Sequence, residues 1–102
     1  MKLIKEICEH ITEEIDDAEC YAKLALHYKE EQPDIAKVYY WLSEQEMLHM
    51  NKLHEAVVST IKKYRDEYGE PPESMMAVYN YLHDKQIEEA AEVKMLQRMY
   101  AE

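Results

Sequence analysis

The chain has 102 residues, enough for a single domain with one modest core. Its 22 acidic and 12 basic residues give a net charge of −10, which argues against a nucleic-acid partner because phosphates would be repelled. Phe is absent, Gly occurs once and Pro three times, and no apolar run approaches the ~18 residues of a membrane span. We therefore expect an all-α domain over residues 1–102 with no membrane partner.

Two observations near the N-terminus bear on the compartment. Acidic residues within the first ten positions do not fit a signal peptide. Cys8 and Cys20 lack the C-x-x-C spacing of a redox or metal motif, so we expect both to be free, buried thiols. These features favour a cytoplasmic protein.

The helix-breaking residues divide the chain into three helical segments, at about 3–30, 33–68 and 72–100. Pro33 interrupts the first pattern, and Gly69 followed by Pro71 and Pro72 is typical of a helix end and a restart. Because the connection at residues 31–34 is short, the first two segments should form an antiparallel hairpin.

Each segment has apolar residues at helical spacing. The first has one row: Ile4, Ile7, Ile11, Ile15, Ala18, Ala22 and Ala25. The second has two rows and needs more than one neighbour: Ile35, Val38, Leu42, Leu53, Ala56 and Tyr64, then Tyr40, Met47, Met50, Val57, Val58 and Ile61. The third has a less regular row: Met75, Tyr79, Leu82, Ile87, Ala90, Val93 and Leu96.

Glu46 and His49 interrupt the first row of the second helix. They continue its spacing between Leu42 and Leu53, so we expect them at core positions. A buried charge is costly unless it is paired or coordinates a metal ion. Glu46-x-x-His49 also places a carboxylate and an imidazole one turn apart on one helix face, and both are suitable ligands for iron, manganese or zinc.

The hairpin suggests partners for this pair. With a turn centred near residues 32 and 33, Glu46 lies level with Glu19, and His49 lies level with Asp16, roughly 20 Å from the turn. Helical di-metal proteins use a Glu from each of two helices and Glu-x-x-His from each of the other two. One chain would supply half of that set, so we expect two chains to complete a four-helix bundle around a shared site.

Two motifs resemble the ferritin-like superfamily of rubrerythrins and bacterioferritins: Glu19-Cys-Tyr-Ala22, and Leu42-x-x-x-Glu46-x-x-His49-x-x-x-Leu53. The short length, single hairpin and extra C-terminal helix are most similar to the encapsulated ferritins. The resemblance implies a di-iron site between subunits, with Glu19, Glu46 and His49 as ligands and a Glu bridging the metals. It also implies ferroxidase activity, in which dioxygen or peroxide oxidises ferrous iron for storage or detoxification.

The chain departs from the family in three respects. We find no targeting extension after residues 96–102, although a capsid-shell partner remains open. Two cysteines cannot build the four-cysteine rubredoxin module of a rubrerythrin, and three helices are too few for a ferritin cage subunit.

Other readings of the polar residues remain open. Asp16 could accept a hydrogen bond from the second nitrogen of His49, or be a solvated acid. Tyr39 could support the site or pack in the core, and His54 should lie about 140° around the helix from His49, on a different face. The main alternative function is a helical dimerisation module whose Glu–His layer only fixes the register. A structural zinc or manganese site is a further one.

Overall fold

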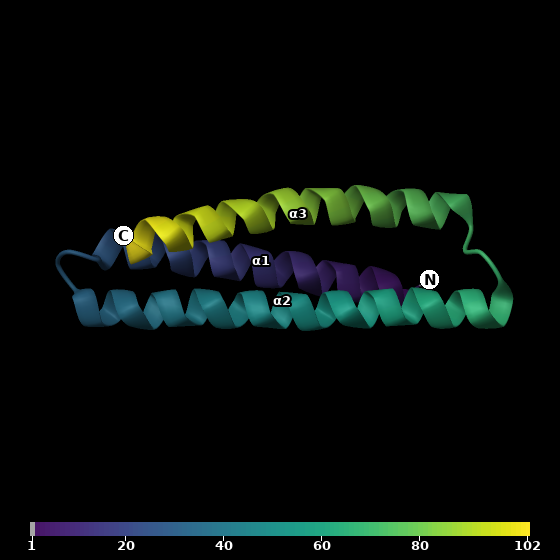
Figure 1. Ribbon diagram of the computed structural model, residues 1–102, viewed down its shortest axis with the longest axis horizontal. Coiled ribbons are helices and arrows are strands. Elements are labelled where there is room, and N and C mark those ends of the chain that lie inside the picture. The colour runs from purple at the N-terminus through teal and green to yellow at the C-terminus, as the bar shows by residue number, and fades with distance from the viewer. Residues whose placement is uncertain (1) are drawn as a thin grey trace.

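The computed structural model describes residues 2–102, which form α1 (Lys2–Tyr28), α2 (Pro33–Tyr68) and α3 (Glu73–Ala101), without a strand. The prediction of an all-α chain with three helices is confirmed. Figure 1 shows α1 and α3 running in the same direction and α2 running against both. The three helices form a rod of 56 × 19 × 18 Å.

α1 packs against both α2 and α3, and its apolar row makes most of the core. The residues of α1 that are buried repeat every three or four positions: Ile4, Cys8, Ile11, Ile15, Ala18, Ala22 and Ala25. Cys8 takes the core place predicted for Ile7, which packs against the cluster only partly buried. The small side chains near the turn allow α2 to approach α1 closely. The Ser43 hydroxyl therefore reaches the Ala18 carbonyl, to which it donates a hydrogen bond at 2.7 Å.

Most of the core contacts of α2 come from its second apolar row, although Leu53 of the first row also packs against the core. Met47, Val57 and Ile61 are buried, as the second row predicted, whereas the prediction for Val58 in the same row is wrong, because it is 49% exposed. Ile35 and Val38, from the first row, expose about half of their surface, at 48% and 54%. The expectation that His49 occupies a core position is wrong for the single chain, because 58% of its side chain is exposed.

Backbone chemistry explains where α2 begins and ends. Pro33 occupies the start of the helix, where its missing N–H costs no hydrogen bond. Gly69 has a positive φ of 82°, and its N–H donates to the Arg65 carbonyl. Only glycine adopts that conformation readily, so Gly69 stops the helix and lets the chain turn toward α3.

α3 is fixed to the hairpin by two glutamines as well as by apolar contacts. Gln86 donates to the Cys8 carbonyl at 3.1 Å, and Gln97 donates to the Ser43 hydroxyl at 2.9 Å. Val93 is the buried apolar residue between them. The prediction that Ile87 packs in the core is wrong: 55% of it is exposed, and the neighbouring Gln86 takes the buried position.

The two cysteines differ in environment. Cys8 is buried, and this burial, together with the Glu9 charge, raises the pKa of its thiol. Cys20 is exposed, so the prediction that it is buried is wrong, because it points away from the buried row that contains Ala18 and Ala22.

Among residues 2–102, we find no helix with the length and apolar character to span a membrane.

Candidate metal centre

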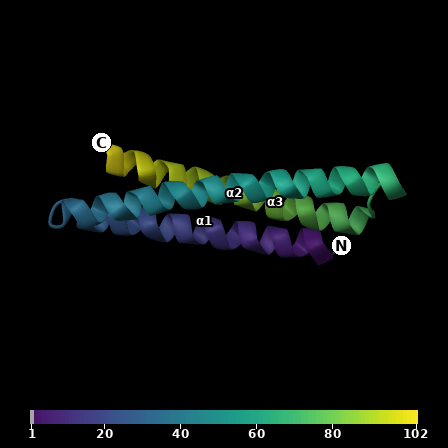
Figure 2. The same cartoon turned by 90° about the horizontal axis from the view of Figure 1, so that it is seen from below.

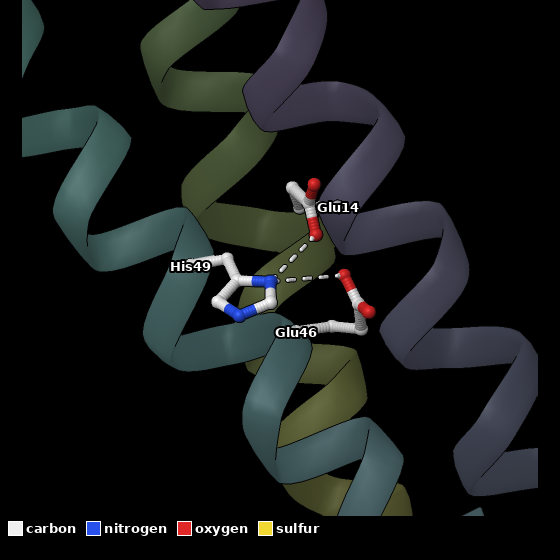
Figure 3. Close-up of side chains that lie close together, drawn as sticks. All are labelled: Glu14, Glu46 and His49. Atoms are coloured by element: carbon white, nitrogen blue, oxygen red, sulfur yellow. Dashed lines mark ion pairs between the residues drawn. The ribbon is translucent and has the colours of Figure 1, made fainter.

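Three potential metal ligands converge where α1 and α2 meet, halfway along the hairpin. The Nδ1 atom of His49 lies 3.4 Å from Glu14 Oε2 and 3.6 Å from Glu46 Oε2. One ligand atom from each residue falls within 4.8 Å of the others. Figure 3 shows the three side chains pointing toward one another, with α3 passing behind the hairpin.

Helix periodicity places each group at the seam between the helices. Glu14 precedes Ile15, which is fully buried, and so it lies at the edge of the buried row of α1. Glu46 and His49 are three residues apart on α2, one turn along the same face. The site therefore rests on two long helices, and loop flexibility does not disturb its geometry.

One carboxylate atom in this cluster lacks a hydrogen-bond partner. Glu14 Oε2 is buried and accepts no hydrogen bond, since the nearby His49 nitrogen lies within ion-pair range but not in hydrogen-bond geometry. The side chains of Glu14 and Glu46 are only 24% and 17% exposed. Two partly buried carboxylates this close together favour a cation, because leaving such oxygens unsatisfied is costly.

Sequence reasoning missed Glu14 because it placed the turn too late. α1 ends at residue 28 and α2 begins at residue 33, so the turn is centred between residues 30 and 31. When the centre of the turn moves by two residues, the residue of α1 opposite a given residue of α2 changes by four positions. Ile15, and not Glu19, then lies opposite Glu46. The contact between Ser43 and Ala18 fits this register. The sequence did contain a signal for the earlier turn. The apolar pattern of the first helix stops before residues 29–32, which are all polar.

Glu19, predicted as a ligand, lies elsewhere in the structure. Its carboxylate accepts a hydrogen bond from Lys23 Nζ at 2.7 Å, and this bond raises the pKa of the Lys23 amine. Asp16 is exposed, and its charge acts on Glu89 of α3. Both acids thus lie on the side of α1 that faces α3, away from Glu46 and His49.

Tyr39 and His54 make ring contacts in two different places. Tyr39 stacks between Tyr21 and Tyr28 of α1, with ring centroids 6.0 and 6.3 Å away. His54 stacks on His83 of α3 at 4.9 Å, on a different face of α2 from His49. The cluster of Glu14, Glu46 and His49 is therefore distinct from both aromatic groups.

The donor set suits a first-row transition metal. Two carboxylates and one imidazole are ligands that iron, manganese and zinc accept. The buried, unpartnered Glu14 oxygen is the observation of this chain that fits such an ion. Three side chains leave coordination positions open for water, a substrate or residues of another chain.

Comparisons with known proteins give no relative: no family model, no curated protein and no solved structure matches the chain.

Proposed function

We propose that the chain is a ferritin-like di-metal protein that oxidises ferrous iron at a site shared by two copies. The observation that carries the proposal is the convergence of Glu14, Glu46 and His49 within 4.8 Å, with one buried oxygen left unpartnered. α1 offers one Glu and α2 offers Glu-x-x-His, which together make half of the ligand set of a helical di-metal site.

The surface around the cluster supports a second copy as the other half. Ile35 and Val38 lie on the same edge of α2 as Glu46 and His49, and both are about half exposed. α3 lies behind the hairpin and leaves this edge open (Figure 3). A two-fold axis here would bring two such clusters together and cover the apolar side chains, completing a four-helix bundle.

The residues of the cluster have separate tasks in this reaction. The carboxylates of Glu14 and Glu46 hold ferrous iron and stabilise the higher charge of ferric iron, while His49 supplies a neutral nitrogen ligand. Ferrous iron is the substrate: two ions give two electrons to dioxygen, which takes up two protons and becomes hydrogen peroxide. Peroxide itself is an alternative oxidant. Manganese or zinc would occupy the same ligands without this turnover.

The test is anaerobic addition of ferrous salt to the purified chain, followed by air. We expect iron bound to the dimer and oxidation faster than in buffer. Glu14→Gln and Glu46→Gln should each lose most of the bound iron, whereas Glu19→Gln, the same substitution elsewhere on α1, should retain it. Absence of bound iron, or equal loss in Glu19→Gln, would contradict the assignment.

A dimerisation module without a metal is the second candidate, favoured by the exposed Ile35 and Val38. Sedimentation over a range of concentrations, with and without EDTA, separates the two. If EDTA changes neither the amount of dimer nor its thermal stability, and Glu46→Leu stabilises the dimer, then Glu46 and His49 have a structural role without a metal. Val38→Glu should dissociate the dimer in either case.

A further inference from the structure

α2 and α3 enclose a groove on the side of the molecule away from the metal cluster. Figure 2 shows that these two helices cross instead of running parallel. Ring contacts join them at two levels, His54 with His83 at 4.9 Å and Tyr40 with Tyr100 at 4.6 Å. Two hollows of about 320 and 420 Å³ lie along α3 between these levels and share Lys94.

The hollow next to the histidines is mostly apolar. Its volume of about 320 Å³ is within the range of small-molecule sites in proteins. Its apolar lining residues come from all three helices: Ile11, Met50, Ile87, Ala90 and Ala91. Ile87 exposes 55% of its surface here, so burying it under a ligand would be favourable.

The neighbouring hollow is cationic. Lys94 and Arg98 line it together with Tyr40 and Gln97. Neither Lys94 nor Arg98 has a carboxylate within ion-pair distance among residues 2–102. By contrast, Lys2 and Lys5, beside a larger hollow at the other end of the molecule, are paired with Glu6 and Glu9.

The absence of acidic residues from the groove is informative in so acidic a chain. Of 102 residues 22 are acidic, yet none lines either hollow. Burial raises the pKa of Tyr40, and the charge of Glu44 and a hydrogen bond from the Tyr40 hydroxyl to Glu44 raise it further. The Tyr40 hydroxyl directs its one proton to Glu44, so the donors left for an anion in this hollow are Lys94 and Arg98.

We propose that the groove binds a small amphiphilic monoanion, a medium-chain fatty carboxylate in free solution. Its hydrocarbon chain would fill the hollow lined by Ile87, Ala90 and Ala91, and its carboxylate would pair with Lys94 and Arg98. Arginine binds a carboxylate through two parallel hydrogen bonds, which fixes the head group, while burial of the chain supplies most of the affinity. The groove lies behind the metal cluster, so this binding does not depend on the proposed iron chemistry.

Decanoate, used below its micelle concentration, is the probe. In amide NMR spectra of the full chain we expect saturable shifts, one ligand per chain, centred on Ala90, Ala91 and Lys94. The double variant Lys94→Gln/Arg98→Gln should bind about tenfold or more weakly, because charge-assisted hydrogen bonds are lost. Lys62→Gln/Lys63→Gln changes the net charge equally at exposed positions outside the groove, and should bind like the parent chain.

Two further arms test the two ends of the ligand. Ala91→Trp, at an exposed position where the larger side chain does not disturb the core, should fill the apolar hollow and abolish the shifts. Decyltrimethylammonium should not compete with decanoate. The proposal is overturned by the absence of saturable shifts, by undiminished binding to the Lys94/Arg98 variant, or by shifts spread over exposed apolar residues such as Val38 and Trp41.

Discussion

The two faces of the α1–α2 hairpin differ in whether their buried polar side chains have hydrogen-bond partners. On the face covered by α3, the Ser43 hydroxyl donates to the Ala18 carbonyl and accepts from Gln97, and Gln86 donates to the Cys8 carbonyl. On the open face, Glu14 Oε2 is buried without a hydrogen-bond partner beside Glu46 and His49. Polar groups interrupt an apolar row on both faces, but only on the covered face does the chain itself satisfy them.

This difference separates a structural polar group from a candidate ligand. Buried polar groups in proteins are almost always hydrogen-bonded, so one without a partner calls for an ion, a water or another chain. A polar residue in an apolar row is therefore weak evidence by itself. The evidence for a metal at Glu14, Glu46 and His49 is the missing partner, together with two carboxylates that face each other.

Ile15→Ala gives the largest expected effect, because it acts on the shared core beneath both faces. Ile15 is fully buried, and such truncations cost about 2–5 kcal/mol through lost burial and the remaining cavity. Urea unfolding at fixed protein concentration measures the loss. Leu48→Ala, at a position that is 58% exposed, is the control and should change the stability little. Equal effects of the two substitutions would contradict the described core.

Ser43→Ala tests whether the covered face depends on its hydrogen bonds. The substitution adds no volume but leaves the Gln97 amide without its acceptor, at a cost of about 1–3 kcal/mol. Ser59→Ala, on the exposed surface of the same helix, should be nearly neutral. If Ser43→Ala is also neutral in urea unfolding, the Gln97 contact does not hold α3 to the hairpin.

The sequence predicted the helices better than their register. Pro33 and Gly69 act locally, so the ends of α2 could be found from single residues. Which residue of α1 lies level with Glu46 depends on the centre of the turn, and an error of two residues there put Glu19 level with Glu46 in place of Ile15, the neighbour of Glu14. Gln86 could not be found either, because its burial depends on reaching the Cys8 carbonyl, 78 residues away in the chain.

Glu14→Leu tests the polar groups of the open face, and here we expect the substitution to raise the stability of the metal-free chain. In metal-free protein the substitution removes a buried oxygen that has no partner, so the stability should rise by about 1 kcal/mol. With saturating metal the parent chain should gain stability and the variant should not. Thermal unfolding with EDTA and with added ferrous salt under nitrogen compares the two. A less stable metal-free variant would mean that Glu14 already has a favourable structural role.

Glu89→Gln gives the smallest expected effect and concerns the acidic side of α3. Burial, followed by the charge of Asp16, raises the pKa of Glu89 above its ordinary 4.5, although Lys85 opposes this. The folded chain therefore holds this proton more tightly than the unfolded chain, and stability falls as pH rises from about 4.5 through the folded pKa. The variant should be more stable than the parent near pH 7, by about 0.5 kcal/mol or less, and equal to it near pH 4. Glu88→Gln, the same substitution at the exposed neighbouring position, is the control in urea unfolding. A gain for Glu89→Gln that is as large at pH 4 as at pH 7 would rule out charge as its cause.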